Sequence, residues 1–244
     1  MPGMPIEKRR NTVEYVPHIG VTRQYWRDII LGVNDGLVSM FLLVVGVVGG
    51  GLDTGQVLLT AIAGGIAGAV SMAAGEYLAT KSQDEVLAAE LDLERTHIAH
   101  FRNRELDQLR GFFEDMGVRE TDMDAVVSAF SENDEALLNA MAALEFGFVE
   151  SERRSPYRAM AASGLLFLAG SLPSVVPFAI IDSSTAALVW ATTLTLAGLF
   201  IVGAVKGNVA NSGQVRSGLE NMIIAGLGGV LAWFIGNAVG ANFA

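Results

Sequence analysis

The stretch QVLLTAIAGGIAGAVSMAAGEYLATKSQDEVLAAELDLERTHIAHFRN, residues 56–103, decides the fold of this chain. Its first half, 56–80, is an apolar run long enough for a helix to cross about 30 Å of hydrocarbon. Its second half, from Lys81 to Asn103, is rich in charged residues and contains no Gly or Pro. Because nothing in the stretch ends a helix, we expect one helix that crosses a membrane and continues beyond it.

Four further apolar runs have the length of a membrane span, at 29–50, 158–181, 185–205 and 217–240. The composition agrees, since 51% of the 244 residues are hydrophobic and 17% charged, with a mean hydropathy of +0.42. The sequence therefore predicts an all-α polytopic membrane protein with five transmembrane helices. A small helical cytosolic domain is expected between the second and third spans.

Residues 81–155, called the acidic block below, hold 18 of the 26 acidic residues and eight of the basic ones. The block therefore carries the whole net charge of −10, and the remainder of the chain is neutral. Turn signals divide it into short helices: Gly117 ends one, Thr121 or Asp122 begins another, and the 131–134 segment begins a last helix reaching about Glu152. We expect a cytosolic N-terminal segment at 1–28, spans 1 and 2 at 29–80, the acidic block at 81–155 and spans 3 to 5 at 156–244.

Lysine and arginine placement predicts the orientation, because cytosolic loops carry an excess of both. The first loop, the third loop and the C-terminal tail contain no lysine or arginine. The basic residues that flank the spans all lie on one side: Arg23, Arg27, Lys81, Arg153, Arg154, Arg158, Lys206 and Arg216. With five spans, this pattern places the N-terminus and the acidic block in the cytosol and the C-terminus outside or in a lumen.

Two function classes are disfavoured by composition. The absence of cysteine excludes disulfides and thiolate metal sites. A net charge of −10 argues against nucleic acid as a partner, because binding phosphates needs a basic surface. Within the spans, closely spaced glycines predict tight helix packing, and Pro173 and Pro177 predict a kink in the third span.

Three residues in the first two spans are candidates for an ion path. Asp35 lies six residues into the first span, and Glu76 lies near the cytosolic end of the second, with Met72 one turn before it on the same face. Charged side chains at membrane depth usually face water or a partner, and a thioether beside a carboxylate suits Fe²⁺ better than Mg²⁺ or Ca²⁺. The alternatives are that Asp35 is a structural hydrogen-bonding group, Glu76 is solvated at headgroup level and Met72 fills the core. For Glu220, at the start of the fifth span, a solvated position is the better interpretation.

The acidic block contains candidate ligands on the helix that continues the second span. Glu90, Glu94 and His97 lie there, and Glu105 follows shortly after. Glu94 and His97 have the Glu-x-x-His spacing that di-iron helical bundles use to place a carboxylate and an imidazole on one face. Those bundles need two such motifs and this chain has one, so the alternative is an ordinary solvated helix face.

Two longer motifs carry a resemblance to a known family. Asn34-Asp35-Gly36-Leu37-Val38 in the first span, and Ser71-Met72-Ala73-Ala74-Gly75-Glu76-Tyr77 with Ser82-Gln83 in the second, are similar to signatures of the vacuolar iron transporter family. Gly170-Ser171-Leu172-Pro173 with Pro177, and the Gly-rich run ending at Ile235-Gly236, agree with it. The resemblance covers about Tyr25 to Gly240.

The resemblance implies a five-span homodimer that exports Fe²⁺ from the cytosol in exchange for protons, with Asp35 and Met72 along the path. It also implies that the cytosolic helices bind metal through Glu94, Glu105, Met141 and Glu145. Two further glutamates of the family fall on His97 and Gln108. Neutral His97 remains a possible ligand, whereas Gln108 is a poor substitute.

No cofactor is expected beyond the transported Fe²⁺ or Mn²⁺, between which an oxygen-rich site does not discriminate. The expected partners are divalent metal ions, protons, the lipid bilayer and a second copy of the chain. The short polar N-terminus favours a prokaryotic cell membrane over a vacuolar one. Two rival hypotheses are a membrane-anchored di-iron ferroxidase and a membrane scaffold that transports nothing.

Overall fold

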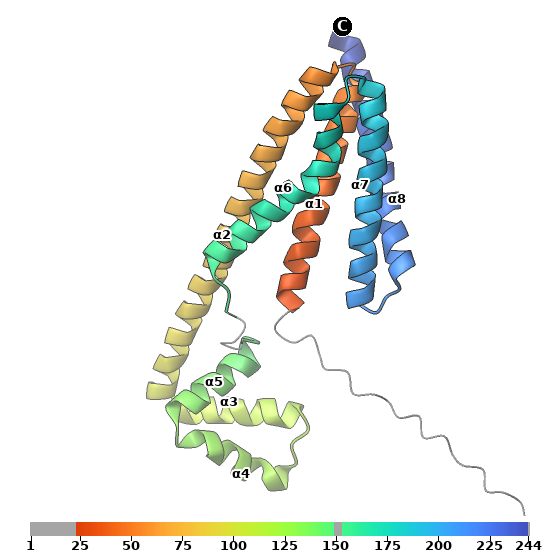
Figure 1. The fold of residues 1–244 in the computed structure, drawn as a ribbon. Helices are drawn as coiled ribbons and strands as arrows, with labels where there is room; N and C mark the ends of the chain where they lie inside the picture. Colours follow the sequence, from red (N-terminus) through yellow and green to blue (C-terminus); the bar gives the residue numbers. More distant parts are fainter. Residues whose placement is uncertain (1–22, 149–152, 244) are drawn as a thin grey trace, which may run out of the picture.

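The computed structural model describes residues 23–148 and 153–243, and within these ranges it contains helices and no strand. The predicted all-α class is therefore confirmed. The helices, labelled in Figure 1, are α1 (Arg23–Gly49), α2 (Thr54–His100), α3 (Arg102–Asp115), α4 (Glu120–Ser131), α5 (Asp134–Glu145), α6 (Pro156–Ile180), α7 (Ser184–Val209) and α8 (Gln214–Phe243).

Five of these helices are long and apolar enough to cross a membrane: α1, α2, α6, α7 and α8. This confirms the five predicted spans, with ends that differ by a few residues. At 47 residues, α2 is about 70 Å long, far more than a bilayer core requires. As expected, it continues without interruption from the apolar half of the deciding stretch into the charged half.

The spans alternate in direction, so the chain reverses at two ends of the bundle (Figure 1). The start of α1, the turn between α7 and α8 and the helices α3 to α5 lie at one end, called the block end below. The turns at 50–53 and 181–183 and the end of α8 lie at the opposite end. The predicted N-terminal segment 1–28 falls mostly outside the described residues, which begin at Arg23.

Local signals explain where the spans begin. Asp53 caps α2 by accepting a hydrogen bond from the Gln56 N–H, and the Gln56 side chain accepts one from the Asp53 N–H in return. This reciprocal arrangement satisfies two backbone donors that a helix start otherwise leaves free. The Ser183 side chain caps α7 in a similar way by accepting a bond from the Ala186 N–H.

Small residues allow the spanning helices to approach closely. A Cβ at Gly236 of α8 would overlap the backbone carbonyl of Gly46 in α1, and a Cβ at Gly36 would overlap that of Phe167 in α6. By contrast, nothing lies within 4 Å of the Cβ position of Gly226, although the sequence places it in the same Gly-rich run. Backbone contact of this kind is how helices associate in lipid, where no hydrophobic force drives them together.

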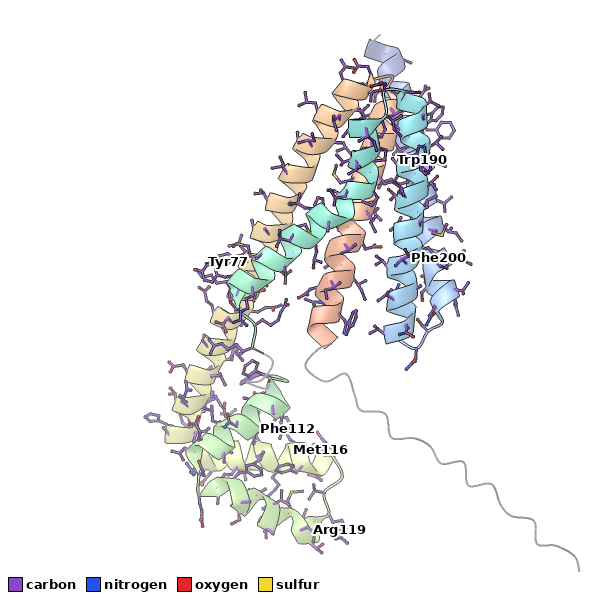
Figure 2. The ribbon with its side chains drawn as sticks, viewed as in Figure 1. Tyr77, Phe112, Met116, Arg119, Trp190 and Phe200 are labelled. Carbon is purple, nitrogen blue, oxygen red and sulfur yellow. The ribbon has the colours of Figure 1, made fainter. Side chains whose placement is uncertain are left out.

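The bundle presents large apolar side chains to its surroundings. Trp190 on α7 is 56% exposed and projects outward from the bundle (Figure 2), and Leu227 on α8 is 68% exposed. Exposed apolar side chains along whole helices suit a lipid environment. In the interior, the hydroxyls of Ser174 and Thr195 are fully buried and form a hydrogen bond of 2.9 Å between α6 and α7.

Three short helices follow the charged half of α2: α3 and α5 pack against it, and α4 packs against α3 and α5. The core of the acidic block is apolar and consists of Ile98, Leu109, Leu137, Leu138 and Met141. Asn133 caps α5, so the predicted start at 131–134 is confirmed.

The predicted end of that last helix at about Glu152 is wrong. α5 ends at Glu145, and Gly147 adopts a φ of +65°, a conformation that favours glycine and breaks the helix. Glu152 itself lies outside the described residues.

Candidate metal centre

Three side chains of the acidic block meet at the end of α2. Glu94 and His97 lie one turn apart on α2, and Glu105 reaches them from α3 because the chain breaks at Phe101 between the two helices. His97 Nδ1 lies 3.8 Å from Glu94 Oε2 and 3.7 Å from Glu105 Oε1. Two ligand atoms that each lie about 2.1 Å from one ion are at most about 4.2 Å apart, and both His97 distances meet this limit. All three ligand atoms lie within 4.8 Å of one another, so the group could hold a metal ion.

The three side chains differ in how far they are buried. The Glu94 and Glu105 side chains are only 3% and 5% exposed, whereas the His97 ring is 37% exposed. Glu94 Oε1 is buried and has no hydrogen-bond partner. An unpaired buried carboxylate oxygen is costly unless something binds it, so this atom is a candidate ligand for a cation.

The environment of Glu94 disfavours its charge. Burial, together with the nearby charges of Glu105 and Glu145, raises the pKa of its carboxyl to about 7, and His97 acts in the opposite direction. A divalent cation placed among these carboxylates would favour the charged form of Glu94 instead, since it offsets both the cost of burial and the repulsion between carboxylates.

The other predicted ligands of the block take different positions. Met141 is fully buried in the core of the block on α5, one turn before Glu145. Glu145 is exposed, yet it lies near enough for its charge to act on Glu94. Gln108 is partly buried on α3, and Glu90 is exposed on α2 one turn before Glu94, outside the three-residue cluster.

A di-iron centre of the helical-bundle type would need a second group of ligands. In the part of the chain that the structure describes, Glu94, His97 and Glu105 are the one group of three or more acidic or histidine side chains close enough to share an ion. This geometry gives the ferroxidase hypothesis no added support.

Asp35, Met72 and Glu76 lie on the first two spans. Asp35 is partly exposed on α1 and accepts a 3.0 Å hydrogen bond from Ser39, which is exposed one turn further along. Met72 is partly buried and packs against the core between the spans, and its backbone carbonyl faces the Ser163 hydroxyl of α6 at 3.5 Å. Glu220 is exposed in the first two turns of α8, and its solvation stays a prediction.

Glu76 is held in a group of charges that sequence reasoning missed. Arg154, two residues before α6, pairs with both Glu76 of α2 and Asp28 of α1. In the sequence, Arg154 is recognisable only as an orientation signal, and Asp28 is not recognisable as part of a site. The signal available was an acidic residue beside Arg27 at the start of an apolar run.

Helix geometry orders these residues along the bundle. Asp28 and Glu76 share a partner and therefore lie at the same level near the block end. Met72 lies one turn deeper, about 6 Å, and Asp35 lies two turns beyond Asp28, about 10 Å. Since Asp28 and Asp35 are seven residues apart, they lie on nearly the same face of α1.

Comparison with known proteins gives a consistent result. Residues 26–237 match the sequence model of the VIT family. The chain is 31% identical over 216 residues to vacuolar iron transporter 1 of Arabidopsis thaliana, covering 87% of this chain and 85% of that one. It is also 31% identical to vacuolar iron transporter 2 of Oryza sativa subsp. japonica, covering 87% of each chain. With the vacuolar iron transporter of Toxoplasma gondii the identity is 25%, over 92% of this chain and 79% of that one.

Proposed function

This chain belongs to the VIT family, and from that premise we propose that it transports Fe²⁺ across the membrane, from the side that carries the acidic block to the other. Relatives named vacuolar iron transporter support the transport of iron. The observation that carries the proposal is the carboxylate of Asp35, placed more than three turns inside the spanning helix α1 and partly exposed there. Ionisable groups at that depth are costly and are typical of ion paths.

The acidic block acts first in this proposal. Its net charge of −10 raises the local cation concentration. Glu94, Glu105 and His97, with Glu145 and Met141 of α5, then hold the ion on the cytosolic side. Mn²⁺ is a second candidate cargo, because the same oxygen-rich ligands accept it.

The ion next passes along α1 and α2 by way of Glu76, Met72 and Asp35, which we call the proposed path. Metal ligands must be deprotonated to bind, so a metal ion and protons compete for the carboxylates of the path. Proton antiport follows if the proton taken up after release comes from the opposite side. We propose further that a second copy of the chain covers the exposed polar face formed by Asp35 and Ser39, since lipid would leave that face unsatisfied.

The excess of lysine and arginine at the block end supports a cytosolic location for that end. In the same orientation, the C-terminus lies outside the cytosol. The transport proposal therefore describes export of metal from the cytosol.

The test uses proteoliposomes with the block end outward and a pH-sensitive dye inside. In the wild type we expect Fe²⁺ to enter and protons to leave. Asp35→Asn removes the charge at nearly constant shape and is expected to abolish both fluxes, whereas Glu220→Gln, an exposed carboxylate on α8, is expected to retain them. A correctly oriented, folded wild type that carries no metal would overturn the proposal.

A further inference from the structure

Arg154 lies between two spanning helices at the block end. Its Nη1 lies 3.4 Å from Glu76 Oε1 on α2, and its Nη2 contacts Asp28 Oδ2 on α1. The side chains of Arg154, Asp28 and Glu76 are 16%, 13% and 21% exposed. Ion pairs shielded from water to this degree are screened much less than surface pairs, so they hold their partners more firmly.

Asp28 has a second cationic neighbour, which is solvent-exposed. Arg27 lies 3.5 Å from Asp28 Oδ1, but its side chain is 66% exposed. It therefore offers Asp28 a weaker partner than Arg154 does. The shielded contacts join α1, α2 and the residues immediately before α6 through one guanidinium.

The position of this guanidinium coincides with the cytosolic end of the proposed path. Glu76 is the first path carboxylate that an ion from the acidic block would meet, with Met72 one turn and Asp35 about two turns deeper. A cation that binds Glu76 must therefore displace Arg154 from it. The two positive charges cannot both occupy the same carboxylate at low cost.

Arg153 provides a contrast one residue away. It forms two bonds to Asp84, of 2.6 and 3.0 Å, and these hold the pKa of the Asp84 carboxyl below its usual range. Asp84 lies two turns beyond Glu76 on α2, in the charged half of that helix. Arg153 thus joins the same stretch of chain to Asp84, in the charged half of α2.

We propose that Arg154 is the gate at the cytosolic end of the path: a tethered cation that occupies Glu76 and Asp28 when no metal is present and gives way when metal binds. This inference rests on the proposed function. Arg154 acts through Glu76 and is a positioning residue, not a ligand of the ion.

The gate has a kinetic signature. When a binding-competent state is populated only in part, the apparent affinity is reduced by that fraction. If the paired state holds about nine molecules in ten, its removal lowers the KM for Fe²⁺ about tenfold. The maximal rate should change less, because the steps after Glu76 do not involve Arg154.

The experiment measures initial Fe²⁺ flux against concentration in proteoliposomes for the wild type, Arg154→Ala, Arg154→Lys and the control Arg153→Ala. We expect Arg154→Ala to lower KM and Arg153→Ala to leave it unchanged. Arg154→Lys should fall between them, because an ammonium keeps the charge but lacks the fork that spans two carboxylates. If Arg154→Ala does not fold, the KM of Arg154→Lys still decides the question.

Each outcome has one meaning. An unchanged KM with a reduced maximal rate in both Arg154 variants would assign Arg154 a structural role and overturn the gate. An equal fall in KM for Arg153→Ala would also overturn it, since loosening of the chain before α6 would then be the cause. A wild type that carries no metal overturns the proposed function itself, which distinguishes that failure from failure of the gate alone.

Discussion

The carboxyl group of Glu94 is buried, its pKa is raised to about 7, and its Oε1 lacks a hydrogen-bond partner. The sequence indicated this residue through its spacing to His97, but spacing says nothing of burial. The approach of Glu105 depends on the break at Phe101, where φ is −129° and ψ is 32°, and no Gly or Pro marks it. For that reason the helix was expected to continue to Asn103, and the three-residue cluster was not predictable as a unit.

The raised pKa of Glu94 predicts proton release on metal binding. Below pH 7 the carboxyl holds a proton that a metal must displace, so the apparent affinity should rise with pH, by up to about tenfold per unit from this group, and level off above 7. Calorimetric titration of the full chain with Mn²⁺ at pH 6, in two buffers of different ionisation heat, counts the protons. Glu94→Gln should release close to one proton fewer than the wild type, and Glu90→Gln, an exposed neighbour, should match the wild type. Equal release from all three would contradict the assignment.

Met141 provides a test of the ligand set that the family resemblance implies. Its side chain is fully buried in the core of the acidic block, so Met141→Leu keeps the volume and should cost less than about 1.5 kcal/mol of stability. If the thioether binds the ion, the affinity for Fe²⁺ falls several-fold while the melting temperature is nearly unchanged. Met123→Leu, at an equally buried methionine of α4, is the matched control. Equal affinities in both variants would make Met141 a core residue only.

At the scale of the element, the spans were predictable and the ends of the short helices less so. The five apolar runs stand out because a bilayer imposes a minimum length on each. The end of α5 was placed too late because the run up to Glu152 lacks proline, although Gly147 was a visible stop signal. The group of Arg154, Asp28 and Glu76 was not predictable, since it joins residues up to 126 positions apart that only the packing of α1, α2 and α6 brings together.

The crossing of α1 and α8 depends on the absence of a side chain at Gly236. Because a Cβ there would overlap the Gly46 carbonyl, Gly236→Ala must push the two helices apart, at a cost of about 1–3 kcal/mol. Gly226→Ala, on the same helix with nothing within 4 Å of its Cβ, should be tolerated. The measurement is the fraction of each variant that remains monodisperse in detergent after heating. Equal monodisperse fractions for the two variants would show that the close approach of Gly236 to Gly46 does not limit stability.

Across the whole molecule, the distribution of lysine and arginine agrees with the alternating direction of the five spans. All lysines and arginines of the described ranges belong to the acidic block or to span ends at the block end, and the opposite end has none. The chain crosses five times, so the start of α1 and the end of α8 lie at opposite ends of the bundle. The acidic block continues from the second span and therefore lies at the same end as the start of α1. The side of the membrane on which the block end lies is a prediction of the positive-inside rule.

The natural absence of cysteine makes that prediction directly testable, because a single introduced thiol is the only reactive one in the chain. Ser131→Cys in α4 and Gln214→Cys at the start of α8 lie at the block end, whereas Asp182→Cys lies in the turn before α7 at the opposite end. In intact cells, a membrane-impermeant maleimide should label Asp182→Cys and leave the other two unlabelled until the cells are lysed. Labelling of the first two before lysis would invert the orientation, and the proposed direction of metal transport would invert with it, because the acidic block would then collect its ions from outside the cytosol.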